Sequence, residues 1–104
     1  MATAIKIFAT FDEESVDLIR DMGFDIVKIA SCSAKDWPLI EKVSNLGKPI
    51  VFSTGGLLIK DIDNLVSFFE HRGNDFCIMH CVSIYPTPKN ELNLNLIQTL
   101  KQRY

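Results

Sequence analysis

The fold is decided by residues 75–88, DFCIMHCVSIYPTP. Apolar side chains nearly fill the stretch from residue 76 to residue 84, which is too short for an amphipathic helix and lacks clean alternation. This pattern predicts a parallel strand that is buried on both faces. Residues 80–85 then bring imidazole, thiol and hydroxyl groups to the end of the strand, and the two prolines that follow end ladder pairing. Because ligands of parallel α/β folds bind beyond the carboxyl ends of strands, the sequence predicts a site here.

Three similar strand-then-helix units precede this stretch. We expect strands over residues 5–9, 26–30 and 49–52, and helices from a Thr10–Glu13 capping box to Gly23, from Asp36 to Gly47, from Ile59 to His71 and from Leu94 to Gln102. Repeated strand-then-helix units predict an α/β fold with four parallel βα units joined by right-handed crossovers. Two architectures fit this pattern: half of a (β/α)8 TIM-type barrel, and an open doubly wound parallel sheet.

Length and composition limit the possible classes of protein. The 104 residues suffice for one domain, which we place at residues 1–104, and 47% hydrophobic with 23% charged residues is typical of soluble globular proteins. A net charge of -2 without a basic stripe argues against nucleic-acid binding, and no run approaches the ~20 apolar residues of a membrane span. Three irregularly spaced cysteines indicate reduced thiols, as in a cytoplasmic protein.

Small polar residues follow each expected strand. The residues in question are Thr10, Ser31 with Ser33, Ser53 with Thr54 and Gly55, and His80 through Tyr85. If these positions converge on one rim, their hydroxyl and backbone N–H groups would suit a phosphate or a carboxylate. The alternative is that serine, threonine and glycine act here only as caps and turn residues.

Lys28 is the one charged residue of an otherwise apolar strand. A lysine in a buried strand carries a large desolvation cost unless it faces a polar cavity or an anion, so we interpret Lys28 as an anion ligand. The alternative is an edge-strand lysine that extends to solvent. His80 is interpreted as a structural histidine, because Cys77 and Cys81 lie too far apart along a strand to share one metal ion.

Four motifs resemble the N-acetylneuraminate (sialic acid) synthase family. In order, they are FDEESVDL at residues 11–18, KIAS at 28–31, GKPI at 47–50 with STG at 53–55, and HCVSIYP at 80–86. Four motifs in order at near-native spacing are far more specific than one match. The sequence departs from the family at Ala9-Thr10-Phe11, which lacks a proline, and at Leu58, where members carry threonine or serine.

The resemblance implies a (β/α)8 barrel that condenses phosphoenolpyruvate with an N-acetylmannosamine-like sugar, giving a nine-carbon sialic acid and phosphate. Lys28, Ser31, Ser53 and Ser83 would contact phosphoenolpyruvate, Thr10 would be a further anion ligand, and Tyr85 would face the amino sugar. Members use a divalent metal ion, manganese or magnesium. The chain corresponds to the third to sixth strands, so the metal-binding histidines of the last strands would lie outside it.

We therefore expect a single partial catalytic-barrel domain that holds no metal and has little or no activity alone. The alternative is a non-catalytic α/β module that binds an anion or a protein partner. A half-barrel leaves two strand edges and an apolar inner face uncovered, so we also expect a homo-oligomer.

Overall fold

The structure is a computed structural model that describes residues 4–104, so the first three residues of the expected domain lie outside the described part. Strands and helices alternate along the chain. They are β1 (Ile7–Thr10), α1 (Glu13–Met22), β2 (Ile26–Ile29), α2 (Trp37–Ser44), β3 (Ile50–Ser53), α3 (Ile59–His71), β4 (Phe76–Met79) and α4 (Asn95–Arg103), with 3-10 turns at Ser31–Ser33 and Lys89–Glu91. The four expected βα units are confirmed.

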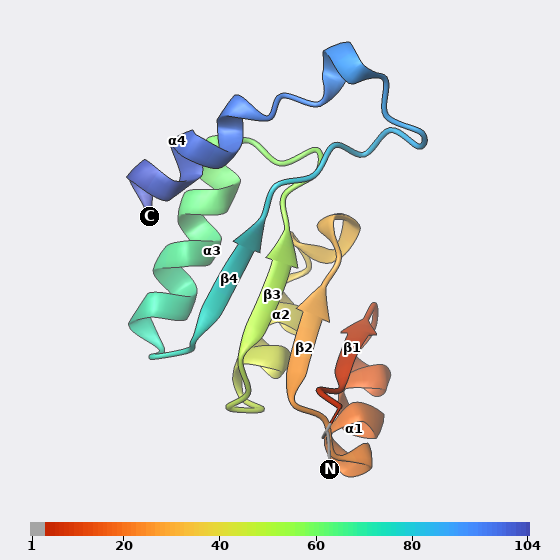
Figure 1. The fold of residues 1–104 in the computed structure, drawn as a ribbon. Helices are drawn as coiled ribbons and strands as arrows, with labels where there is room; N and C mark the ends of the chain where they lie inside the picture. The colour runs from red at the N-terminus through yellow and green to blue at the C-terminus, as the bar shows by residue number, and fades with distance from the viewer. Residues whose placement is uncertain (1–3) are drawn as a thin grey trace.

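The four strands form one parallel sheet in the order β1-β2-β3-β4 (Figure 1). Each strand therefore pairs with the next strand of the chain, and the order does not reverse within the sheet. A doubly wound sheet requires such a reversal, which places helices on both faces. The open doubly wound alternative is wrong, and the arrangement is half of a TIM-type barrel.

One face of the sheet packs against the helices and forms the core. Val27, Ile29 and Phe52 on this face are fully buried. The helices contribute further buried side chains, which are Val16, Ile19, Leu39, Ile40, Val43, Ile62, Leu65, Val66, Phe69 and Leu100. The core thus lies between the sheet and the helices. It consists of apolar residues at alternate positions of the strands and at helical spacing on the helices.

The opposite face of the sheet carries no helix within residues 4–104, and we call it the open face (Figure 1). By strand alternation and register it presents Ile7, Ala9, Ile26, Lys28, Val51, Ser53, Cys77 and Met79. Met79 is 49% exposed, and Cys77 is exposed as well. The expectation that the fourth strand is buried on both faces is therefore wrong for this chain, because β4 is an edge strand covered on one side only.

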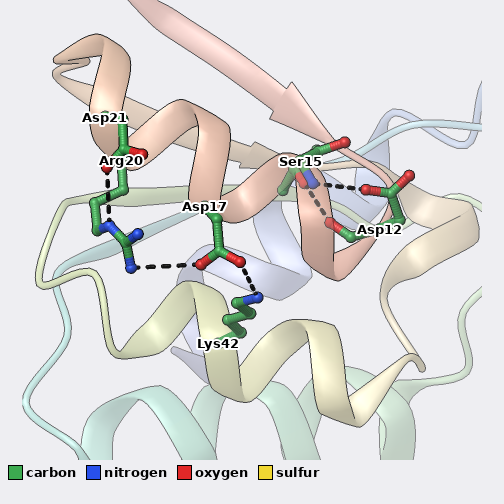
Figure 2. Close-up of polar contacts among 7 residues, drawn as sticks. Asp12, Ser15, Asp17, Arg20, Asp21 and Lys42 are labelled. Carbon is green, nitrogen blue, oxygen red and sulfur yellow. Dashed lines mark hydrogen bonds and ion pairs between the residues drawn. The ribbon is translucent and has the colours of Figure 1, made fainter.

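The first helix begins at Asp12 and not at a Thr10–Glu13 capping box. The Asp12 carboxylate accepts a hydrogen bond from the Ser15 backbone N–H at 2.7 Å, as Figure 2 shows. The Ser15 side chain, and next its backbone N–H, hold the pKa of Asp12 below its usual range by hydrogen bonding to the carboxylate. Thr10 cannot occupy the cap position because it is the last residue of β1. The capping prediction failed by two residues, while the helix end at Gly23 is confirmed.

The outer surfaces of the helices are joined by ion pairs. Lys42 of α2 donates to Asp17 of α1 at 2.7 Å, and Arg20 approaches the same carboxylate at 3.4 Å (Figure 2). The bond from Lys42 is the largest cause that lowers the pKa of Asp17. These side chains are solvent-exposed, so their contribution to stability is small.

Residues of α3 and α4 form a tighter contact. The Arg103 guanidinium donates two hydrogen bonds to the Asp63 carboxylate, at 2.8 and 2.7 Å, and the Tyr104 hydroxyl donates a third at 2.6 Å. These donors lower the pKa of Asp63 from 3.8 to about 2. The contact fixes the last helix on the outer surface of α3.

No helix within residues 4–104 is long and apolar enough to cross a membrane.

The Asp63 contact predicts an acid-dependent loss of stability. A carboxylate with a lowered pKa in the folded state stabilises the protein above pH 3.8, and this stabilisation is lost as the pH falls toward about 2. Asp63→Asn should therefore lower the urea midpoint at pH 6, and the gap to the unmodified chain should close between pH 4 and pH 2. In an Arg103→Met background, Asp63→Asn should produce a smaller pH-dependent gap, because Arg103 donates two of the three hydrogen bonds to the Asp63 carboxylate. A gap that stays constant with pH would contradict the assignment.

The open face predicts self-association. Ile7 on the β1 edge is 56% exposed and Met79 on the β4 edge is 49% exposed, beside strand edges with unpaired backbone groups. We expect concentration-dependent dimers in analytical ultracentrifugation, with Ile7→Lys and Met79→Lys together weakening association at least tenfold. Leu18→Lys is the matched control, since Leu18 is 62% exposed on α1. A monomer at every concentration would overturn this prediction.

Candidate functional site

A hollow of about 380 Å³ lies at the carboxyl ends of β2, β3 and β4, and we call it the anion hollow. It is lined by Lys28, Ala30, Ser31, Cys32, Ser53, Cys81, Ser83 and Tyr85. Five of the six residues predicted as ligands are therefore brought together, although they come from three different strand ends. In Figure 1 these ends meet at the top of the sheet, beneath the long segment between β4 and α4. These residues therefore share one end of the sheet, as the position of sites in parallel α/β folds leads one to expect.

Two of the lining residues belong to the strands themselves. Lys28 pairs in register with Val51, and Ser53 pairs with Met79, so both side chains project from the open face. Lys28 is half-buried, and Ser53 is 7% exposed. No carboxylate of residues 4–104 forms a salt bridge with Lys28. A half-buried ammonium group without a counter-ion makes this part of the hollow attractive to an anion.

Hydroxyl and backbone groups follow from the loops. Ser31 starts the 3-10 turn after β2, and its hydroxyl oxygen accepts a hydrogen bond from the Gly55 N–H at 2.9 Å. The Cys81 thiol lies 3.2 Å from the same oxygen. One serine oxygen therefore connects the loops after β2, β3 and β4. Ser83 and Tyr85 lie further along the last loop and are exposed, Tyr85 to 85%.

Thr10 is not part of the anion hollow. It pairs with Ile29 and so lies on the helix-covered face, where it is fully buried. Its hydroxyl donates to the backbone carbonyl of Asp12 at 3.1 Å, which fixes the turn between β1 and α1. The first strand thus contributes a structural threonine, and the structure does not bring it to the other predicted ligands.

Two thiols line the hollow beside the predicted ligands: Cys81 belongs to the strand-end stretch 80–85 expected there, and Cys32 was not predicted as a ligand. Cys32 follows Ser31 directly, and Cys81 lies two residues before Ser83. All three cysteines of the chain are free thiols, Cys77 being the third. If β4 continued beyond Met79, strand alternation would place Cys81 on the same face as Cys77, which is the open face.

His80 has a structural role, as predicted. Its Nε2 lies 2.8 Å from the carbonyl oxygen of Leu92 and joins the end of β4 to the segment that leads into α4. Thr54 adds a second link, because its N–H and its hydroxyl both donate to the Met79 carbonyl, at 3.1 and 3.2 Å. These bonds hold the loop after β4 beside the loop after β3, which keeps the rim of the hollow in place.

Two other hollows have a different lining. One, of about 370 Å³, lies between β4 and α4 beside Phe76, Ile78 and Ile97. The other, of about 350 Å³, lies beside Leu57, Ile59, Ile62 and Leu96. Neither combines a lysine or arginine with several hydroxyl groups. The anion hollow does, and we therefore assign the candidate site to it.

Residues 4–104 contain no group of three or more His, Cys, Asp or Glu side chains that could hold a metal ion. The chemistry of the anion hollow is that of an ammonium group with hydroxyl, thiol and backbone N–H donors.

The fold places the chain with TIM-barrel-type proteins, and a solved synthase of this type is among the structures that it matches. The model of the NeuB family matches residues 2–104. The chain belongs to this family, and the resemblance to sialic acid synthases is confirmed.

Three relatives illustrate the similarity. A Chromobacterium violaceum protein named for spore coat polysaccharide biosynthesis is 56% identical, with a TM-score of 0.93, over 95% of this chain and 30% of its own. The Leptospira borgpetersenii N-acetylneuraminic acid synthetase, in complex with citrate, is 34% identical, with a TM-score of 0.90, over 92% of this chain and 34% of its own. N-acetylneuraminate-9-phosphate synthase of Drosophila melanogaster is 34% identical over 92% of this chain and 26% of its own. The chain thus spans about a third or less of each relative.

Proposed function

We propose that this chain supplies the phosphoenolpyruvate-binding part of a sialic acid synthase-type barrel. The parent reaction condenses phosphoenolpyruvate with an N-acetylmannosamine-like sugar and releases phosphate. The observation that carries the proposal is the convergence of Lys28, Ser31, Ser53 and Ser83 on one hollow. Family membership supports it, and so does the Leptospira relative, whose structure holds citrate, another small carboxylate anion.

The chemistry of the hollow suits phosphoenolpyruvate. The ligand carries a carboxylate and a phosphate, so it needs a cation and several donors and cannot tolerate a nearby carboxylate. Lys28 supplies the cation, and no carboxylate pairs with it among residues 4–104. Ser31, Ser53 and Ser83 supply hydroxyl donors. Charge-assisted bonds of this kind are shorter and stronger than neutral ones.

Tyr85 is assigned to the amino sugar. Its side chain is 85% exposed at the outer rim of the hollow, beyond the ring of serines. A second substrate that meets the carbon end of phosphoenolpyruvate must approach from solvent. An exposed aromatic ring with a hydroxyl group can pack against a sugar face and hydrogen-bond to it.

Replacement of Lys28 tests the anion site. Lys28→Met should weaken phosphoenolpyruvate binding about 10- to 150-fold, because a hydrogen bond to a charged group contributes roughly 1.5–3 kcal/mol. The affinity is measured by isothermal titration calorimetry. Lys48→Met is the matched control: it removes the same charge just before β3, at the opposite end of the sheet, and should change binding less than twofold. Equal losses in the two variants would reduce the effect to net charge and contradict the site.

A turnover assay separates the enzyme proposal from a pure binding module. We expect the purified chain, given manganese and both substrates, to form no sialic acid above background, because its described residues provide no metal-binding group. Product is measured by mass spectrometry, with the Leptospira borgpetersenii synthetase as positive control. Addition of a polypeptide carrying the remaining strands of the family barrel should produce turnover. Binding without turnover in that mixture would favour the non-catalytic anion-binding module, and full activity of the chain alone would contradict the proposal.

A further inference from the structure

Gly55 lies where the loops after β2, β3 and β4 come closest together. The residue is buried, and its N–H donates to the Ser31 hydroxyl oxygen at 2.9 Å. A Cβ atom at this position would overlap Ser83 Oγ and would stand 2.8 Å from Cys81 Sγ. It would also lie 3.1 Å from Ser31 Oγ. All three neighbouring side chains line the anion hollow.

The reason for glycine at this position is space and not backbone conformation. Gly56, the next residue, has a φ of +73°, a value that favours glycine, and nothing lies within 4 Å of a Cβ built there. Gly55 is not among the residues with positive φ. An alanine would therefore fit the backbone of residue 55 but not its surroundings, whereas at residue 56 the reverse holds.

We propose that Gly55 is the positioning residue of the anion hollow. Because it has no side chain, the hydroxyl groups of Ser31 and Ser83 and the thiol of Cys81 can close around its backbone. The Gly55 N–H then donates a hydrogen bond to the Ser31 hydroxyl oxygen. The hydroxyl hydrogen of Ser31 stays available for donation to an anion or to Cys81. The identity of the anion is taken from the proposed function, whereas the contacts around Gly55 do not depend on that function.

A Cβ at residue 55 would act on the site without unfolding the chain. The atoms it meets are the ends of three side chains in loops, and none belongs to the core between the sheet and the helices. These side chains can rotate or shift with their loops. The expected result is a displaced Ser83 and Cys81, a widened hollow, and donors that no longer converge on one small dianion.

The test compares Gly55→Ala with Gly56→Ala in phosphoenolpyruvate titrations. We expect Gly55→Ala to bind at least tenfold more weakly while its far-UV circular dichroism is unchanged. Gly56→Ala should lower the melting temperature, through backbone strain, and leave the affinity within twofold. Ser83→Ala removes the atom that the new Cβ overlaps most, so Gly55→Ala should weaken binding less in the Ser83→Ala background than in the unmodified chain. Wild-type affinity in Gly55→Ala, or simple additivity in the double variant, would overturn the role.

A second readout is independent of any ligand. Displacement by the new Cβ should expose Cys81, so iodoacetamide should alkylate Cys81 several-fold faster in Gly55→Ala than in the unmodified chain or in Gly56→Ala. Peptide mass spectrometry separates Cys81 from the exposed Cys32 and Cys77. If the unmodified chain fails to bind phosphoenolpyruvate, the proposed function is wrong, and the alkylation rate still decides the position of Gly55. An unchanged alkylation rate of Cys81 in Gly55→Ala would overturn the positioning role of Gly55.

Discussion

Burial of only one face of the parallel sheet is the constraint on which the other features of this structure depend. Val27, Ile29 and Phe52 are fully buried against the helices, and burial of such side chains supplies most of the driving force for folding. Strand alternation then sends every second residue to the open face. A core position cannot hold an unpaired charge, but the open face can hold Lys28, and the register places Ser53 on the same face. Lys28 and Ser53 of the candidate site thus occupy positions that the core does not use.

The same constraint explains which parts of the fold the sequence predicts. Helical spacing, glycine stops and apolar strand runs are local, and they indicated the four βα units and the polar strand ends that form the anion hollow. Whether a strand is covered on its second face is not local, because it depends on which neighbours are present. The apolar run at β4 is suited to burial on both faces, yet this chain covers only one.

The candidate site shows the limits of a local pattern more clearly. Ser31, Ser53 and Ser83 were predicted from their positions after strands, and the structure brings them together. Thr10 is also a hydroxyl residue at a strand end, but its register with Ile29 places it on the helix-covered face, whereas the register of Ser53 with Met79 places Ser53 on the open face. A shift of one residue in a strand end reverses the direction of a side chain. Gly55 and Cys81 belong to the predicted strand-end stretches, but their contacts with Ser31 could not be predicted, because these contacts join loops that are 24 and 50 residues from Ser31 in sequence.

Enclosure of the open face links the fold to the strength of the proposed site. An ammonium–anion attraction falls as the surrounding dielectric constant rises, by roughly fourfold between a surface-like value near 20 and bulk water near 80. Lys28 is half-buried on a face that residues 4–104 leave open, so water reaches the space in front of it. In a closed barrel the same lysine and serines would lie at the mouth of an interior filled by side chains. Under the proposed function, the residues of this chain would set which anion fits, and closure of the open face would strengthen the attraction that holds the anion.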